Sequence, residues 1–379
     1  MSKYAFGDIA INSTEKKKPE PSDKATYIGL EHLDSGSLTV RRFGADVAPI
    51  GDKLVMKKGD VLFGKRRAYQ KKVAIAPFDG IFSAHGMVLR PKTEVIDKDF
   101  FPLFIASDYF LDAAIRISVG SLSPTINWRD LKVLEFSLPP LDEQRRLAKV
   151  LWAALDLKEV YQTLLARCDE MASSRFIEMF GDPDNNTKSF PMTKIGSVAQ
   201  CVAGATPSTS VKEYWENGTI PWMSSGEVNL GRIFSTEKKI TQKGYDSAST
   251  HLVPPHTVVV AMAGQGKTRG TVAITEIELC TNQSLCSLVI TTQTINPFYL
   301  LHFLRTQYEN LRNASNGDGG RGGLNLHIIG NYPIILPPLG LQNEFAAFVE
   351  QLDKSKVALQ KNIDRLDILI KTLLQEHFG

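Results

Sequence analysis

Two basic segments carry the residues best suited to chemistry on an anionic partner. The first, GKRRAYQKK at 64–72, joins two short apolar runs, as a hairpin would. The second, at 262–271, joins TVVV to VAI in the same way. The candidate contact residues are Lys65, Arg66, Arg67, Tyr69, Lys71 and Lys72 in the first segment, and Gln265, Lys267 and Arg269 in the second.

These residue types point to nucleic acid. Lysine and arginine neutralise backbone phosphates, and arginine or glutamine can bond the edges of purines in the major groove. Tyr69 could stack on a base or hold a phosphate. A merely solvated run of charge is the alternative, and composition alone favours it. The recurrence of a polar, cationic hairpin in both halves of the chain favours function instead.

The second segment also permits a nucleotide-binding interpretation. AMAGQGKT at 261–268 fits a relaxed phosphate-loop pattern, with alanine in place of the first glycine. A phosphate loop must open a helix, because the helix N-terminus helps to hold the phosphates. The residues that follow, RGTVAI, predict a strand instead. A phosphate-loop enzyme using 261–268 therefore stays the weaker alternative.

Two further segments could approach a phosphate backbone. GDGGRGG at 317–323 would bring its main chain and Arg321 close to phosphates, although a flexible connector is an equally good interpretation. TPS at 206–208 predicts a turn whose hydroxyls, on Thr206 and Ser208, could bond phosphate oxygens.

Catalytic and metal-binding patterns are missing from the sequence. It has no Asn-Pro-Pro-Tyr or Asp-Pro-Pro-Tyr run, so no amino-methyltransferase site is expected. The 7 histidines lack metal-ligand spacing, and the 4 cysteines form no CxxC pair. No leader-like N-terminus and no membrane-length apolar run occur. We therefore expect a reduced, cytoplasmic setting and no metal or cofactor in this chain. The net charge of +3 permits a nucleic-acid partner without requiring one.

A long repeat is expected to position these segments. Residues 138–181 and 336–379 align without a gap at a constant offset of 198, and 13 of the 44 positions are identical. Both copies open with LPPL and close with Phe-Gly. Paired prolines precede helices well, and a closing glycine favours a left-handed cap. Each copy therefore predicts one long helix.

The apolar spacing within each predicted helix alternates between four and three residues. In the second copy this heptad seam runs from Phe345 to Leu373 over four repeats, and the first copy has a rougher seam in the same frame. An ordinary core helix in each of two domains is the alternative. We expect the two helices to pack on each other as an antiparallel coiled coil. The predicted spacer or partner-docking residues are Gln144, Leu151, Trp152, Leu165, Gln342, Leu352, Leu359 and Leu366.

The intervening regions repeat one plan. We divide the chain into a globular region at 1–137, a helical spacer at 138–181, a second globular region at 182–335 and a second spacer at 336–379. Short strands and helical runs alternate in both globular regions, and ATYIGLEHL at 25–33 and SGSLTVRRF at 35–43 are expected to be strands. The predicted fold class is α+β, with two similar mixed α/β domains and an approximate two-fold relation between the repeats.

Such a duplicated chain suits a pseudo-symmetric partner, of which duplex DNA is the common example. Diverged loops on matched frames would let each domain read a different sequence. The helices would then set the distance between the two half-sites.

The sequence resembles the DNA-specificity subunit of type I restriction–modification enzymes over its whole length. The resemblance is carried by LPPLDEQ at 138–144 and its copy LPPL at 336–339 with Gln342, together with GATPS at 204–208, WMSSG at 222–226 and TNQ at 281–283. The second copy departs from the Glu-Gln ending, with Leu341 before Gln342.

This resemblance implies two target-recognition domains that each read one half of a split target in double-stranded DNA. It implies helical spacers that dock two methyltransferase subunits, which carry S-adenosylmethionine and methylate adenine. Restriction subunits that use ATP and Mg²⁺ can join such a complex. It also implies that this chain is itself not an enzyme.

Overall fold

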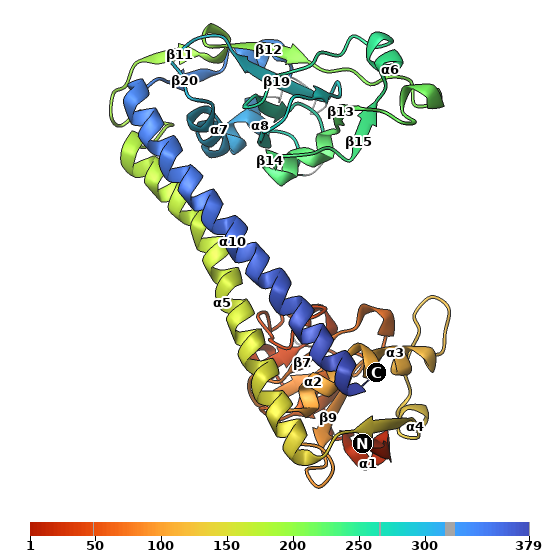
Figure 1. Cartoon of the computed structure of the whole chain (residues 1–379). Helices are drawn as coiled ribbons and strands as arrows, with labels where there is room; N and C mark the ends of the chain where they lie inside the picture. The colour runs from red at the N-terminus through yellow and green to blue at the C-terminus, as the bar shows by residue number, and fades with distance from the viewer. Residues whose placement is uncertain (48, 265–266, 315–322, 379) are drawn as a thin grey trace. The chain divides into compact units, whose positions relative to one another are not determined.

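The chain folds into two compact units. The computed structural model describes residues 1–47, 49–264, 267–314 and 323–378 (Figure 1). The first unit comprises Met1–Gln162 and Gln360–Gly379, and the second comprises Thr163–Leu359. Each unit thus combines one globular domain with a part of each long helix.

The first unit is an α+β domain built on two four-stranded sheets. Its helices are α1 (Phe6–Ile9), α2 (Phe101–Ala106), α3 (Asp108–Arg116) and α4 (Trp128–Leu131), and it shares α5 (Leu141–Phe180) and α10 (Leu339–Phe378) with the second unit. Its strands are β1 (Ser2–Ala5), β2 (Ala10–Ser13), β3 (Lys16–Lys17), β4 (Tyr27–Ile28), β5 (Lys53–Met56), β6 (Val61–Phe63), β7 (Val73–Ile75), β8 (Gly80–Phe82), β9 (Met87–Pro91) and β10 (Glu135–Leu138).

The main sheet of the first unit has the strand order β2-β9-β6-β7, and the second sheet has the order β3-β5-β8-β4. β6 and β7 are antiparallel neighbours, with Val61 opposite Ile75 and Phe63 opposite Val73. An aromatic core beside the main sheet includes Phe110, whose ring centroid lies 4.9 Å from that of Phe6. This core fixes the base of the β6–β7 hairpin.

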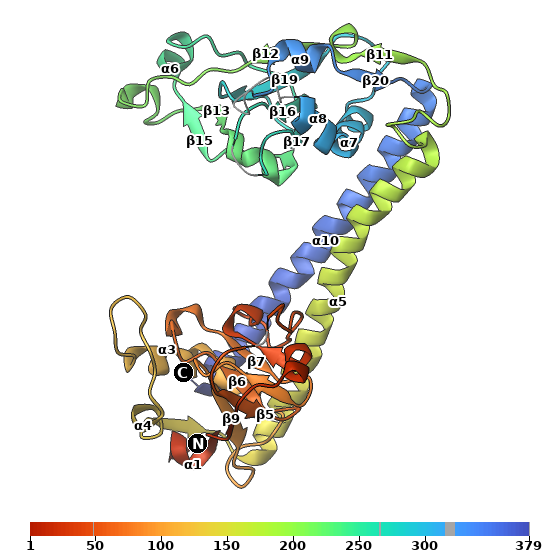
Figure 2. The same cartoon turned by 180° about the vertical axis from the view of Figure 1, so that it is seen from behind.

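The second unit repeats the plan (Figure 2). Its main sheet has the order β12-β19-β16-β17-β14, and its smaller sheet has the order β15-β13-β18. Its strands are β11 (Met192–Lys194), β12 (Ala199–Ala203), β13 (Ile220–Met223), β14 (Arg232–Ile233), β15 (Lys238–Ile240), β16 (Val258–Ala261), β17 (Val272–Thr275), β18 (Cys280–Thr281), β19 (Leu285–Ile290) and β20 (Pro333–Ile335). Its own helices are α6 (Gln242–Asp246), α7 (Pro297–Thr306), α8 (Tyr308–Ala314) and α9 (Leu326–Gly330).

The two main sheets confirm the predicted repeat. Strands β2, β9, β6 and β7 correspond in order and pairing to β12, β19, β16 and β17. Both predicted hairpins exist, because β6 pairs antiparallel with β7, and β16 pairs antiparallel with β17. The segments 64–72 and 262–271 therefore connect equivalent pairs of strands in the two domains.

The strand prediction for residues 25–43 was largely wrong. Only Tyr27–Ile28 is a strand there, and Leu30–His32 forms a 3₁₀ turn. Leu33 and Val40 are buried in the small core under the second sheet, and Gly36 turns the chain with a φ of 75°. The side chains consequently do not alternate between two faces, as a strand would require.

Both long helices begin directly after the paired prolines, as predicted. α5 and α10 are each 40 residues long. Gly181 follows α5 with a φ of 77°, the left-handed conformation expected of a C-terminal cap, and its amide donates to the Ile177 carbonyl at 2.8 Å. Gly379, the corresponding residue after α10, lies outside the described residues.

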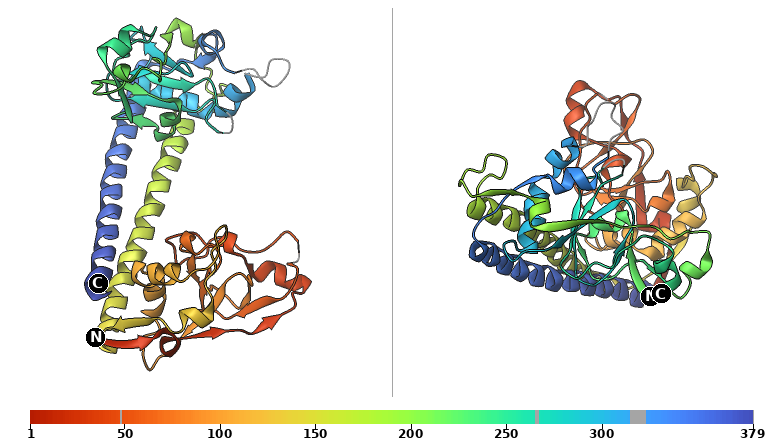
Figure 3. Two further views of the ribbon diagram at one scale, coloured as in Figure 1. Left: turned by 90° about the vertical axis from the view of Figure 1, so that its right-hand side faces the viewer. Right: turned by 90° about the horizontal axis from the view of Figure 1, so that it is seen from above.

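Within each unit, the segments of α5 and α10 lie side by side and run antiparallel (Figure 3). In the first unit Lys158 of α5 pairs with Asp367 of α10, and in the second unit Lys356 of α10 pairs with Asp169 of α5. In the 198-residue repeat, Lys158 corresponds to Lys356, and Asp169 corresponds to Asp367. The same ion pair therefore occurs in both units. The seam positions are more buried than their neighbours, with Leu147, Leu151, Phe345, Val349 and Ile363 buried. The predicted coiled-coil packing is confirmed in each unit.

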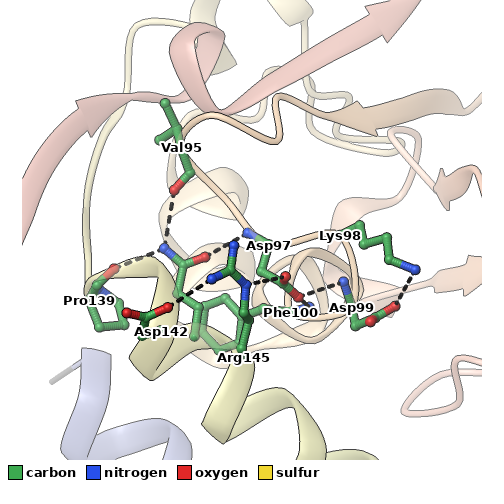
Figure 4. A network of polar contacts seen from close by, with 9 residues as sticks. Val95, Asp97, Lys98, Asp99, Phe100, Pro139, Asp142 and Arg145 are labelled. Carbon is green, nitrogen blue, oxygen red and sulfur yellow. Dashed lines mark hydrogen bonds and ion pairs between the residues drawn. The ribbon is translucent and has the colours of Figure 1, made fainter.

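A buried glutamine ties each long helix to its domain. The amide of Gln144 accepts a hydrogen bond from the Asp97 backbone N–H at 2.8 Å and donates to the carbonyls of Val95 at 3.1 Å and Pro139 at 2.8 Å. Figure 4 shows Val95, Asp97 and Pro139 gathered at the start of α5. Gln342 repeats this arrangement with Asn296, Thr294 and Pro337 at 2.8, 3.1 and 2.7 Å.

Candidate nucleic-acid interface

The loop at 64–72 is a defined turn. Arg67 and Lys71 both have left-handed backbones, with φ of 54° and 48°, on either side of the 3₁₀ turn Ala68–Gln70. Residues with a Cβ rarely adopt this conformation, so the surroundings must hold it in place. Ala68 is buried beneath the turn, and the Arg67 N–H donates to the Pro124 carbonyl at 2.8 Å. The side chains of the loop are therefore presented from a fixed backbone.

Three side chains of this loop face solvent. Tyr69 is 57% exposed, and Arg66 and Arg67 are exposed as well. The Arg66 Nε donates to the Ser123 hydroxyl at 3.0 Å, which orients its guanidinium. The Arg67 side chain has no hydrogen-bond or ion-pair partner among the described residues. An aromatic ring with two guanidinium groups is a suitable surface for phosphates and base edges.

The three lysines of the loop are less exposed than its arginines, and two of them make side-chain contacts within their own unit. Lys71 pairs with Asp108 at 2.6 Å and Asp112 at 2.8 Å, and these bonds raise the pKa of its ammonium group. Lys72 donates to the Leu30 carbonyl at 2.6 Å. Lys65 is half-buried, and desolvation lowers its pKa, with a smaller effect from Lys16. The structure thus places Lys71 and Lys72 as supports of the loop, which the charge pattern alone did not distinguish from Arg66 and Arg67.

The corresponding loop in the second unit carries fewer cations. Lys267 is exposed, and its carbonyl accepts hydrogen bonds from the Tyr308 hydroxyl at 2.7 Å and the Thr271 hydroxyl at 3.0 Å. Arg269 is half-buried, and its carbonyl lies 3.4 Å from a donor nitrogen of Arg312. Two other predicted contact residues, Gln265 and Arg321, lie outside the described residues.

The predicted turn at 206–208 lies beside two tryptophans. Trp222 Nε1 donates to the Ala205 carbonyl at 3.0 Å, and Trp215 Nε1 donates to the Ser208 carbonyl at 3.1 Å. The Thr206 hydroxyl bonds the side chain of Gln283, and the Ser208 hydroxyl lies 2.8 Å from that of Ser210. Both hydroxyls are therefore held by protein partners in this structure.

Three motifs that are far apart in the sequence meet at this turn. A Cβ on Gly204 would lie 1.9 Å from the Thr281 carbonyl oxygen, so only glycine fits. Trp222 pairs with Cys280, and Met223 with Thr281, between β13 and β18. The GATPS, WMSSG and TNQ segments are thus one structural cluster, which explains their residue types without any catalytic role.

The phosphate-loop alternative finds no support. The loop is followed by β17, a strand buried in the main sheet, where a phosphate loop needs a helix. Gly266 lies outside the described residues. No three histidine, cysteine, aspartate or glutamate side chains in the described part of the chain form a group that could hold a metal ion. In that same part, no helix has the length and apolar character of a membrane span.

The predicted spacer residues mostly pack inside their units. Gln144, Gln342 and Leu151 are buried, and Trp152 donates from Nε1 to the Asp99 carbonyl at 2.7 Å. Leu165, Leu352, Leu359 and Leu366 are half-buried seam residues. They shape the helix pair and leave little surface for a partner to contact.

A second apolar set on the helices, outside the predicted docking residues, is exposed. It comprises Val150, Leu157, Val160, Ile368 and Leu369 in the first unit, and Leu164, Met171, Ile177, Leu339 and Val357 in the second, each 38–67% exposed. Val150, Leu157 and Val160 follow one another at seven and three residues, so they share one face of α5.

The sequence was compared with family models and with known proteins, and it matches one family over most of its length. The model for the Type I restriction modification DNA specificity domain matches residues 8–165 and 188–366. The chain is 26% identical over 163 residues to the Type I restriction enzyme EcoR124I/EcoR124II specificity subunit of Escherichia coli, covering 42% of this chain and 39% of that protein. It is 30% identical over 134 residues to the Type I restriction enzyme MjaIX specificity subunit of Methanocaldococcus jannaschii, covering 34% of this chain and 30% of that protein. The aligned parts therefore span well under half of these relatives.

Two solved structures share the fold. A crystal structure of the S subunit of a type I restriction–modification system from M. genitalium matches with a TM-score of 0.64 at 15% identity, covering 100% of this chain and 96% of that one. A chain from a study of complex assembly and conformational transition of the type I R-M system matches with a TM-score of 0.57 at 19% identity, covering 100% and 97%. These matches extend over both repeats.

Proposed function

Because the chain belongs to the family of type I restriction–modification DNA specificity domains, we propose that it reads a split target in double-stranded DNA, one half with each unit. The observation that carries this proposal is the repeated hairpin. β6–β7 and β16–β17 have the same pairing, yet the loops that they present differ in sequence. A shared frame with different loops suits a target whose two halves differ.

In the first unit, we assign the contact to Arg66, Arg67 and Tyr69. Two guanidinium groups and a ring on a fixed turn can bond phosphates and guanine edges, while Lys71 and Lys72 hold the turn from below. In the second unit, the exposed Lys267 takes the phosphate-binding role. Gln265 and Arg269 stay predicted contacts on the basis of the sequence alone.

The exposed apolar residues of the two helices support a docking role. Each unit exposes such side chains from both α5 and α10, and water-exposed valine, leucine and methionine on one helix face are typical of an interface. We propose that each unit docks one methyltransferase subunit, which gives one specificity chain to two methyltransferase chains. Restriction subunits would join through those partners.

The chemistry in this proposal belongs to the partners. S-adenosylmethionine would bind the methyltransferase subunits, and ATP with Mg²⁺ would bind the restriction subunit. This chain would contribute the choice of site and the spacing between the two half-sites, and would itself make or break no bond.

A selection experiment tests the proposal. The complex of this chain with its methyltransferase subunit is incubated with duplex DNA of random sequence, and the retained DNA is sequenced. We expect two conserved blocks separated by a gap of fixed length and free sequence. A single continuous block, or no enrichment at low salt, would contradict the proposal.

A further inference from the structure

The second unit contains a cavity that the proposed function leaves unused. Its volume is about 660 Å³, within the range typical of small-molecule sites. Residues of α5, α7 and α10 line it, together with the turn that precedes β14. The cavity therefore lies where the recognition domain meets its own helix pair.

Two polar side chains of α7 line the cavity without a protein partner. His302 and Arg305 are three residues apart, so they share one face of the helix. His302 is only 7% exposed, and its ring packs edge-on against Phe345 at a centroid distance of 5.1 Å. Neither side chain has a hydrogen bond or an ion pair with any residue that the structure describes. Arg305 is exposed, whereas His302 is buried, and buried polar groups normally have partners. The imidazole therefore has unused bonding capacity beside a guanidinium.

The neighbouring charges are already matched. Arg232 pairs with Glu276 at 2.6 Å and with Asp353 at 2.5 Å, and Lys356 pairs with Asp169. Both carboxylates that line the cavity are therefore engaged, and the five N–H donors of Arg305 are left for another acceptor.

The protonation of His302 suits an acceptor ligand. Desolvation lowers the pKa of His302 to about 3, and the charges of Arg305 and Lys356 add to this effect. The ring is thus neutral near pH 7, with one N–H donor available beside the guanidinium. A Cβ on Gly231 would lie 3.0 Å from Arg305 Nη2, so the backbone of the turn closes over the guanidinium on one side.

The first unit has a crevice in the corresponding place, with different chemistry. The bonds of Gln144 and Gln342 align Asp97 with Asn296, an offset of 199. The same offset places Leu103 at the position of His302, and Ala106 at that of Arg305. The crevice of the first unit, about 420 Å³, includes Ala106 and Asp367, the latter being the repeat partner of Asp169. The first unit thus has neither an imidazole nor a guanidinium at these two positions.

We propose that the cavity binds one small organic anion per chain, with its carboxylate or phosphate held by Arg305 and His302. The apolar part of the ligand would pack on Phe298, Leu230 and Phe234, of which Leu230 and Phe234 are 67% and 63% exposed at the cavity. A site without a repeat partner favours a ligand that the chain takes only once.

Titration calorimetry on the full-length chain tests this inference. The probes are phenyl phosphate, inorganic phosphate and, as a neutral match, benzyl alcohol. We expect one phenyl phosphate per chain, bound more tightly than either of the other probes. Arg305→Ala should weaken it by about tenfold or more, because charge-assisted bonds are the strong ones. His302→Leu should have a smaller effect in the same direction. These two changes introduce the residue types that the first unit has at the equivalent positions, Leu103 and Ala106.

Arg116→Ala is the matched control, because Arg116 lines the crevice of the first unit. It should leave phenyl phosphate binding unchanged. If Arg305→Ala loses its native circular dichroism, Arg305→Lys replaces it, since lysine keeps the charge without the planar fork and should bind more weakly than the wild type. Equal affinity in the wild type and the folded Arg305 variant would overturn the proposal, as would the absence of binding to any anion.

A DNA titration separates this site from the proposed function. If Arg305→Ala lowers the salt dependence of DNA binding by about one phosphate contact, the cavity serves the DNA backbone, and the small-anion proposal is wrong. A wild-type chain that binds phenyl phosphate but no DNA would support the anion site and contradict the proposed reading of DNA.

Discussion

The two units use identical residues to build their frame and different residues to present their surfaces. Gln144 and Gln342 make the same three hydrogen bonds, and Lys158–Asp367 and Lys356–Asp169 are the same ion pair written twice. The hairpin loops and the two crevices share positions but not chemistry. In this duplicated chain, identity between the repeats therefore marks structure, and divergence marks the places where a partner is met.

Disrupting the exposed helix face should have the largest effect. Leu157→Asp with Val160→Asp places two charges on an apolar surface of α5, and we expect a loss of at least about 2 kcal/mol in binding of the methyltransferase subunit. Gln162→Asp with Ala166→Asp adds the same charge to exposed positions on another face of α5 and should bind normally. Sedimentation of the purified mixtures measures both. Equal loss in the two variants would mean that charge, and not the apolar face, is responsible.

Removing the buried glutamines tests the shared frame. Gln342→Ala leaves the Asn296 N–H without its acceptor and should cost about 1–3 kcal/mol of stability. Gln144→Ala should cost a similar amount, because its three bonds have nearly the same lengths. Denaturant unfolding with a fluorescence readout gives both values. If one variant kept the stability of the wild type while the other was strongly destabilised, the two buried glutamines would not be equivalent.

Lengthening the helices tests whether they set the gap between half-sites. Four residues inserted after Glu159, with four more at the equivalent position after Val357, lengthen each helix by about 6 Å. At about 3.4 Å per base pair, the unspecified gap should grow by about one or two base pairs. The half-sites themselves should not change. Methylation mapping reads out the gap, and an unchanged gap would mean that the helices do not act as the ruler.

Reversing one cross-helix charge should have the smallest effect. Lys158→Glu meets Asp367 with like charge, but both side chains are partly solvated, so we expect only about 0.5 kcal/mol of destabilisation. Adding Asp367→Lys should restore stability. In the second unit, Lys356→Glu should destabilise the fold more than Lys158→Glu, since Lys356 also lies 3.6 Å from Asp353. Adding Asp169→Lys should restore part of that stability. Thermal unfolding at low salt compares the four variants.

The sequence predicted the parts of the fold that rest on long periodic patterns. The heptad seams, the prolines before each helix and the hairpins at 64–72 and 262–271 were all found, because apolar periodicity reports packing directly. The segment at 25–43 was misjudged, because its apolar residues are buried through turns and not through alternation. Local propensity does not contain that information.

Site residues were harder to predict, because charge does not reveal its partner. Lys71 and Arg67 look alike in the sequence, yet only Lys71 meets the carboxylates of Asp108 and Asp112, which lie 37 and 41 positions further along the chain. Gln144 looked like a surface residue for docking, whereas it is buried with three backbone partners. Such contacts depend on tertiary structure, and one sequence cannot supply them.

The central claim is that each unit reads its own half of the target. Methylation-site mapping of a host that expresses the methyltransferase subunit with the Arg66→Ala, Arg67→Ala and Tyr69→Ala variant tests it most directly. The account predicts that one block of the recognised sequence becomes degenerate, while the other block and the gap stay as in the wild type. Loss of preference in both blocks, or an unchanged sequence in both, would contradict it.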